Sequence, residues 1–214
     1  MNKNTTIGIF LIVMGVSLMT MVSHFRSDDG DAGFTKKELE ILDNVDSIMR
    51  VLTIDKPDDL SVLRCTSTDL DDETLLSEDF ARLCQLMIST VTHPSQDGVG
   101  IAAPQVGLNR RVVAVQRFDK EGEPFEIYPN IRIVRAADSL AIGSEGCLSV
   151  PDRSEEVERS QEIEIEYTAL PSSTENAGLP LPTVRETING FTAVIFQHEV
   201  DHLDGVLYID RVSK

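Results

Sequence analysis

The chain has 214 residues, 41% of them apolar and 26% charged, which is an ordinary composition and enough length for one well-buried domain but not for two. The formal net charge of −17 predicts an acidic surface that repels phosphate backbones, so we expect no direct binding of nucleic acid. The odd total of three cysteines excludes a disulfide framework. Cys65 and Cys84 have apolar neighbours, which favours free buried thiols over a disulfide between them.

An uncharged apolar run, IGIFLIVMGVSLMTMV, occupies residues 7–22. It has no polar face, which argues against a buried helix of a globular domain. No small-residue cleavage site ends the run, so we expect residues 1–25 to be an uncleaved membrane anchor in preference to a cleaved signal peptide. Lys3 before the run favours export of the domain. The alternatives are export after cleavage and a cytoplasmic protein.

The folded domain is expected at residues 35–214, after a polar, glycine-containing linker at residues 26–34. Apolar residues at helical spacing predict an amphipathic helix or an extended arm over residues 36–52 and a helix over residues 75–92. A glycine- and proline-rich stretch at residues 98–107 predicts a shaped loop.

Extended segments dominate the middle of the domain. We expect them at residues 111–118, 124–133 and 147–151. At residues 161–170 apolar and acidic residues alternate, as in a half-buried antiparallel strand, and residues 171–182 predict a loop. The clearest helix covers residues 191–203, between a capping Asn189 and a terminating Gly205. Strands followed by a helix favour an α+β fold over parallel βαβ units.

The last predicted helix carries two histidines at a spacing suited to a metal ion. His198 and His202 are four residues apart in FQHEVDHLDG, so they lie on one helix face, one turn apart. Two imidazoles so placed can hold one divalent ion, and Glu199 can take a proton from water beside it. The alternative is a surface helix with two chance histidines.

A catalytic site of this kind needs a third protein ligand and an open position. No glutamate follows Glu199, which excludes the downstream ligand of thermolysin-like proteases. Tyr208 stands where metzincins have a third histidine. Cys147 in SEGCLSVPD is the remaining candidate, because thiolates bind zinc and ferrous iron strongly. A buried structural thiol is the other interpretation of this cysteine.

Three segments together resemble the three motifs of the peptide deformylases, in the same order. They are GVGIAAPQVG at residues 98–107, EGCLSVP at residues 145–151 and QHEVDHLDG at residues 197–205. The resemblance implies a deformylase-like α+β fold, with small antiparallel sheets packed around a C-terminal metal-binding helix. It also implies hydrolysis of the N-formyl group from the terminal methionine of newly made polypeptides, with release of formate.

The resemblance further implies a role for each residue of the metal site. Cys147, His198 and His202 would bind one divalent ion, with ferrous iron as the first choice and zinc as the second. Glu199 would remove a proton from the attacking water and later pass a proton to the leaving amine.

Other residues of the motifs would act on the substrate. The side-chain amide of Gln105 and the backbone N–H of Leu148 would donate hydrogen bonds to the developing oxyanion. Val99, Gly100 and Ile101 would pair with the substrate backbone, and Gly100 would let that backbone come close.

The chain also departs from the family pattern. Tyr128 stands where an asparagine is common, and no basic C-terminal helix for docking on ribosomes follows the motifs. Nascent chains on ribosomes are nevertheless expected partners. The apolar N-terminus keeps two alternatives open: a membrane-tethered metallopeptidase or amidase on the same fold, and a non-catalytic relative.

Overall fold

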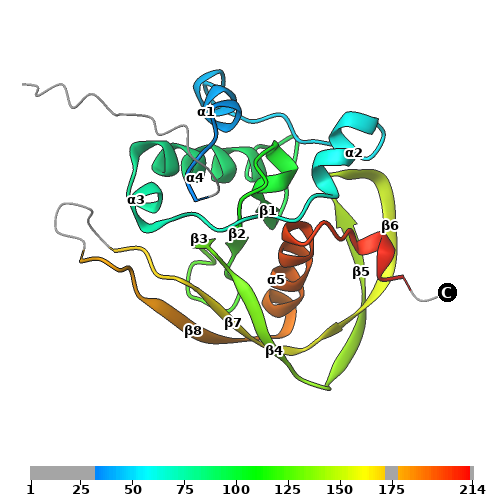
Figure 1. Cartoon of the computed structure of the whole chain (residues 1–214). Helices are drawn as coiled ribbons and strands as arrows, with labels where there is room; N and C mark the ends of the chain where they lie inside the picture. Colours follow the sequence, from blue (N-terminus) through cyan, green and yellow to red (C-terminus); the bar gives the residue numbers. More distant parts are fainter. Residues whose placement is uncertain (1–31, 172–177, 213–214) are drawn as a thin grey trace, which may run out of the picture.

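The computed structural model describes residues 32–171 and 178–212 (Figure 1). The predicted membrane anchor and most of the predicted linker lie outside these residues. Within the described part, no helix combines the length and apolar character needed to cross a bilayer. The last linker residues already contact the domain, since the carbonyl of Ala32 accepts a hydrogen bond from the N–H of Asp71.

Four helices form the N-terminal half of the fold: α1 (Lys36–Asp43), α2 (Pro57–Leu63), α3 (Asp72–Leu75) and α4 (Glu78–Val91). Thr35 begins α1 through a reciprocal capping box with Glu38. The predicted helix over residues 75–92 is confirmed in α4, but it begins later than expected because Ser77 caps it. The stretch from 36 to 52 is helical only in α1 and has no regular structure after it.

Three small antiparallel sheets form the rest, as expected for the α+β class. The first, in the order β1-β2-β3, contains β1 (Gly100–Ala102), β2 (Val112–Gln116) and β3 (Phe125–Pro129). The second, in the order β4-β7-β8, contains β4 (Arg132–Ala136), β7 (Glu162–Thr168) and β8 (Thr183–Asn189). The third is the hairpin of β5 (Leu140–Cys147) and β6 (Val150–Ser160). Two short 3₁₀ helices, η1 (Ala103–Val106) and η2 (Tyr208–Asp210), complete the fold.

The structure corrects several local predictions. The segment 147–151 is not a strand of its own, because Cys147 ends β5 and pairs with Val150 at the start of β6 across a tight turn. The stretch 124–133 divides into β3 and β4 at Asn130, which has a φ of 55°. Cys65 and Cys84 are free, as expected, but Cys65 is exposed and not buried.

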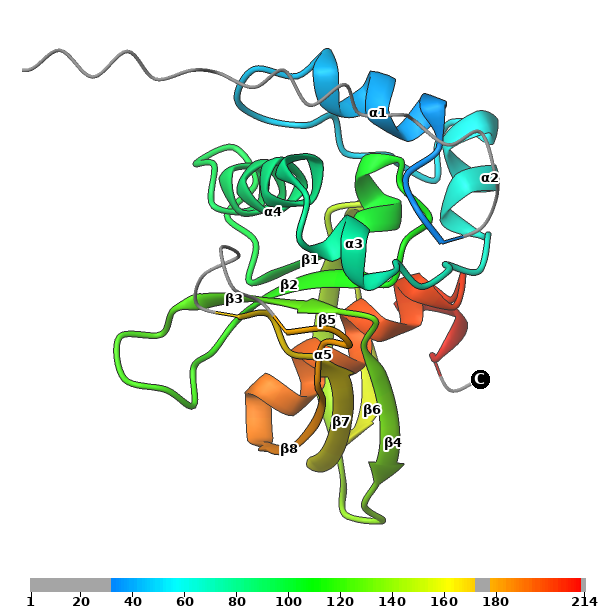
Figure 2. The ribbon, with the colours of Figure 1, turned by 60° about the vertical axis from the view of Figure 1, so that its left-hand side comes forward.

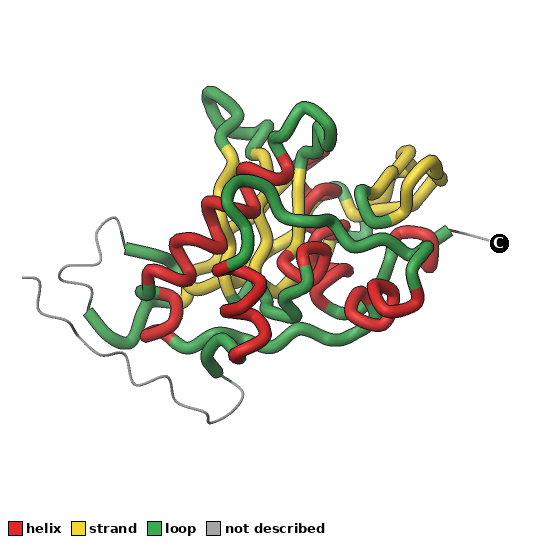
Figure 3. The backbone as a smooth tube through the Cα atoms, turned by 90° about the horizontal axis from the view of Figure 1, so that it is seen from above, coloured by secondary structure: helices red, strands yellow, loops and turns green. Residues whose placement is uncertain are grey.

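Helix α5 (Gly190–Leu203) lies at the centre of the molecule, with the β5–β6 hairpin on one side and the β4-β7-β8 sheet on the other (Figures 1 and 2). Seen from above, that hairpin stands apart from the other strands (Figure 3). Phe196 and Leu203 of α5 pack in a core cluster with Val113 of β2 and Ile163 of β7. Because most of α5 is buried, its polar side chains need either protein partners or a ligand.

Candidate metal centre

Cys147, His198 and His202 come together between the end of β5 and helix α5. One ligand atom from each residue lies within 4.8 Å of the others, and the Cys147 Sγ is 3.2 Å from Nε2 of His202. A tetrahedral zinc site would separate sulfur and nitrogen by roughly 3.6 Å, given its usual bond lengths. The spacing and the donor set of one thiol and two imidazoles therefore fit a zinc or iron ion.

Glu145 orients the first histidine. Its Oε2 lies 2.8 Å from Nδ1 of His198, which leaves Nε2 of that ring to face the thiol. Arg159 holds Glu145 at 2.7 Å and Asp201 at 2.7 Å, and all three side chains are buried. Burial would raise the pKa of Glu145, but its hydrogen bonds with His198 and Arg159 outweigh this and lower the pKa to about 2. The ionised carboxylate therefore fixes the ring orientation of a candidate ligand.

Glu145 was not among the site residues predicted from the sequence, although it begins the quoted motif EGCLSVP. The available signal was an acidic residue two positions before a candidate ligand. Its partner Arg159 lies 14 residues further along the chain, and only the pairing of β5 with β6 brings the two together.

Glu199 is buried, and its Oε2 has no hydrogen-bond partner within the described residues. Burial raises its pKa to about 7. A buried carboxylate oxygen without a partner is costly, so it indicates a place for a bound water or ligand. A pKa near neutrality also suits a group that accepts and returns a proton.

Gly100 makes room for this glutamate. A Cβ at residue 100 would lie 2.5 Å from Oε1 of Glu199. The expected reason for glycine at this position was the approach of a substrate backbone. In the structure, the carboxylate of Glu199 is itself a reason for the missing side chain.

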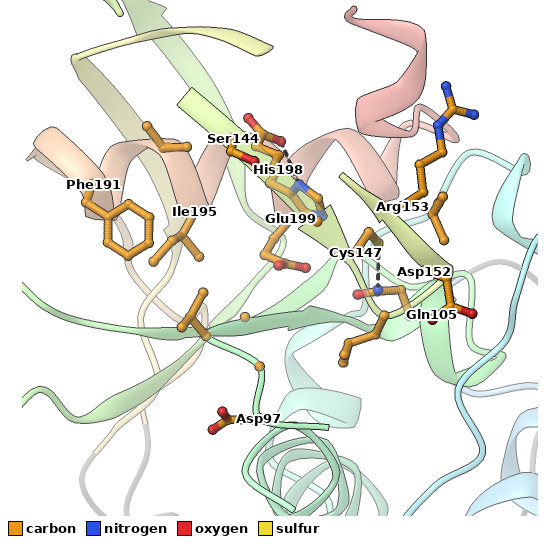
Figure 4. Close-up of a pocket in the computed structure, with 18 residues that line it drawn as sticks. Asp97, Gln105, Ser144, Cys147, Asp152, Arg153, Phe191, Ile195, His198 and Glu199 are labelled. Carbon is orange, nitrogen blue, oxygen red and sulfur yellow. Dashed lines mark hydrogen bonds and ion pairs between the residues drawn. The ribbon is translucent and has the colours of Figure 1, made fainter. Parts of the chain in front are cut away.

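Gln105 is buried in η1 with its amide held at both ends. Its Oε1 accepts a hydrogen bond of 2.8 Å from the N–H of Ala102. Its Nε2 consequently faces Ser149 Oγ at 3.2 Å. The same nitrogen lies 3.5 Å from Cys147 Sγ (Figure 4). The donor end of the amide therefore points toward the candidate metal site, as an oxyanion donor requires.

A cavity of about 420 Å³ opens onto this site (Figure 4). It is lined by the predicted residues Val99, Gly100, Gln105, Cys147, Leu148, His198 and Glu199. Beyond them, Phe191, Val194 and Ile195 of α5 form an apolar part of the wall, and the rest of the wall includes the charged residues Asp97, Asp152 and Arg153. Two predicted residues do not line the cavity. His202 is buried next to Cys147, and the side chain of Ile101 packs in a core cluster with residues of α4.

The fold and the site define a class of protein. Small antiparallel sheets surround a buried helix that presents two histidines to a neighbouring thiol. Beside them the helix carries a glutamate with one carboxylate oxygen that is unpartnered within the described part of the chain. Such an arrangement is that of a metal-dependent hydrolase.

Comparison with known proteins places the chain within that class. The family model described as polypeptide deformylase matches residues 48–214. The peptide deformylase of Caulobacter vibrioides is 35% identical over 170 residues, which cover 78% of this chain and 90% of that protein. That of Thermotoga neapolitana is 37% identical over 140 residues, covering 65% and 76%. The chain therefore belongs to the polypeptide deformylase family.

Solved structures of peptide deformylases support the same family assignment. The actinonin-bound class I type b peptide deformylase from Acinetobacter baumannii aligns with a TM-score of 0.65 at 30% identity, covering 78% of this chain and 100% of that one. The peptide deformylase from Thermotoga maritima aligns with a TM-score of 0.64 at 32% identity, covering 79% and 100%. The predicted fold class and family are thus confirmed.

Proposed function

We propose that this protein removes the N-formyl group from the terminal methionine of newly made polypeptides and releases formate. The observation that carries the proposal is the buried carboxylate oxygen of Glu199, which has no partner among the described residues and lies near Cys147, His198 and His202 at a cavity of about 420 Å³. The family membership supports the same reaction. So does a relative from Acinetobacter baumannii with bound Met-Ala-Ser, at 29% identity and a TM-score of 0.65.

Cys147, His198 and His202 would hold one divalent ion, ferrous iron in preference to zinc. When bound, the ion would lower the pKa of a water molecule and polarise the formyl oxygen. The thiolate ligand makes a ferrous site sensitive to oxidation, so the preference is tested by metal analysis of protein purified without oxygen. Zinc as the major metal in active protein purified in this way would reverse the proposed order.

Glu199 would accept the proton of the attacking water and pass a proton to the leaving amine. Its pKa of about 7 places it between the two protonation states at neutral pH. As the formyl oxygen gains negative charge, the Gln105 amide and the backbone N–H of Leu148 would donate hydrogen bonds to it. Loss of one such donor typically costs about 3 kcal/mol of transition-state stabilisation.

The substrate backbone would lie along β1, at residues Val99, Gly100 and Ile101. Among the described strands, β1 is at the edge of its sheet and pairs with β2 alone, so an extended peptide can add to its other side. The methionine side chain would occupy the apolar part of the cavity beside Phe191 and Ile195.

The nature of the acyl group separates this proposal from a general amidase or metallopeptidase on the same fold. The domain should release formate from formyl-Met peptides and leave acetyl-Met peptides and internal peptide bonds uncleaved. Comparable turnover of acetylated or internal substrates would favour the amidase or the peptidase instead.

We also propose that residues 7–22 anchor the catalytic domain, residues 35–214, at a membrane. The unbroken apolar run supports the anchor. Full-length protein should float with lipid vesicles, whereas a protein that begins at residue 32 should stay in the aqueous fraction. Recovery of a mature protein that lacks residues 1–25 from cells would instead indicate cleavage.

A further inference from the structure

Ser149 lies in the two-residue turn between β5 and β6 and is fully buried. We propose that Ser149 is a positioning residue that holds the donor end of the Gln105 amide toward the candidate metal site. The proposal rests on the deformylase function proposed above. Ser149 would then have a functional role in addition to its structural place in the turn.

The side-chain geometry supports this role. Ser149 Oγ accepts a hydrogen bond of 3.2 Å from Nε2 of Gln105, and the other end of the same amide is fixed by the N–H of Ala102 at 2.8 Å. The remaining contact of Nε2 is a longer one, 3.5 Å to Cys147 Sγ. Without the Ser149 hydroxyl, the sulfur would be the one partner left to the amide nitrogen among the residues that the structure describes.

The main chain braces the same two residues. The N–H of Leu52 donates to the carbonyl of Gln105 at 2.7 Å, and the N–H of Ile54 donates to the carbonyl of Ser149 at 3.0 Å. The segment that contains Leu52 and Ile54 thus connects two walls of the site that lie 44 residues apart in the sequence. With the backbone held in this way, the Ala102 N–H and the Ser149 hydroxyl set the orientation of the Gln105 side chain.

The expected effect falls on the transition state. An oxyanion donor acts best when it is already oriented, since no reorganisation is then needed as charge develops. A loosened Gln105 would bind the substrate as before but would stabilise the oxyanion less. Ser149→Ala should therefore lower kcat by about tenfold, part of the 10²–10³-fold typical of losing a whole donor, and leave KM unchanged.

A double-mutant cycle tests whether Ser149 acts through Gln105. In the Gln105→Ala background, Ser149→Ala should cause no further loss of kcat, because the group that it positions is gone. Metal content and melting temperature should stay within the range of the parent protein. Multiplicative losses in the two variants, or a Ser149→Ala protein without cooperative unfolding, would overturn the proposal and make Ser149 a structural residue.

A second readout does not depend on turnover. In metal-free protein, the side-chain NH₂ resonances of Gln105, identified by their absence in Gln105→Ala, should exchange with solvent at least several-fold faster in Ser149→Ala than in the parent. Unchanged exchange would contradict the positioning role even if kcat fell. Faster exchange in a protein that never releases formate would retain the positioning role and reject the deformylase function.

Discussion

Glu199 lies so close to the Gly100 backbone that there is no room for a side chain at residue 100. The Cβ of an alanine at residue 100 would lie 2.5 Å from the Glu199 carboxylate, so Gly100→Ala should displace that carboxylate. We expect kcat to fall about 10²-fold or more, the low end of the contribution of general acid–base catalysis. The rate of formate release by the purified Gly100→Ala protein measures this fall in kcat.

Gly143→Ala is the matched control for this substitution. Gly143 also lies in a strand of the domain, and a Cβ there would meet nothing within 4 Å. It should leave both activity and melting temperature unchanged. Equal activity of the two alanine variants would mean that Glu199 tolerates displacement, and its role as the proton carrier would then be untenable.

Glu145 is predicted to act on metal affinity. Glu145→Gln removes the charge that orients His198. Substitution of a residue that hydrogen-bonds to a metal ligand typically lowers metal affinity by about 10–100-fold. Competition with a chelator measures the change. The exposed Glu158 on the same hairpin supplies the control, since Glu158→Gln removes an equal charge away from the metal site. Equal affinities in the two variants would show that only the net charge matters.

At the scale of elements, α1 shows how far the domain extends beyond the family match. The matched region begins at residue 48, yet Glu38 of α1 forms a buried ion pair of 2.9 Å with Arg110. Removing one partner of such a pair leaves an uncompensated charge. Glu38→Ala should therefore lower the free energy of unfolding by about 3 kcal/mol in urea denaturation.

The exposed Glu40 of the same helix provides the comparison for α1. Glu40→Ala should change the free energy of unfolding by less than about 0.5 kcal/mol. If Glu38→Ala were equally mild, α1 would be an appendage and not a part of the fold.

Elements with a clear apolar period were the ones that the sequence could predict. Helix α4 and strand β7 show this period, and in β2 the residues from Val112 to Val115 are all buried. The β5–β6 hairpin lacks this signal because much of it is solvent-exposed, with Ile142 65% exposed. Its strands are defined by their pairing with each other, which no local pattern records.

A buried arginine links two of the sheets, and its ion pairs make the stability of the domain depend on pH. Arg117 follows β2 and bonds Asp119 and also Glu186 of β8. The hydrogen bond from Arg117 lowers the pKa of Asp119. A carboxylate with a lowered pKa stabilises the fold above its unfolded pKa, near 3.9, and loses this contribution as the pH falls through the lower folded value.

Arg117→Met should therefore destabilise the protein most at neutral pH, by about 3 kcal/mol, and progressively less below about pH 4. Unfolding in urea at pH 7 and pH 3, with a chelator present throughout, measures the difference in the free energy of unfolding between the parent protein and Arg117→Met. The exposed pair of Arg135 and Glu162 is the control, and Arg135→Met should cost less than about 1 kcal/mol. If the loss of unfolding free energy in Arg117→Met did not change with pH, the ionised partners of Arg117 would not be the source of its stabilising effect.

At the scale of the whole molecule, the site depends on contacts between distant segments. The sequence motifs identified Cys147, His198 and Glu199, and the structure brings them to one cavity. Neither spacing nor composition could identify Ser149 as the partner of Gln105, because that contact spans 44 residues and depends on where β5 ends. Motifs thus indicated the residues proposed to react, whereas the fold was needed to find the residue proposed to orient one of them.

Glu199 is proposed to carry the proton in a metal-dependent deformylation, and its substitution tests this role most directly. Parent protein and Glu199→Gln, both purified without oxygen, should bind one metal ion per chain. Only the parent should release formate from a formyl-Met peptide at a substantial rate, with kcat of the variant lower by about 10²–10⁴-fold. Full formate release by a metal-loaded Glu199→Gln protein would contradict the account.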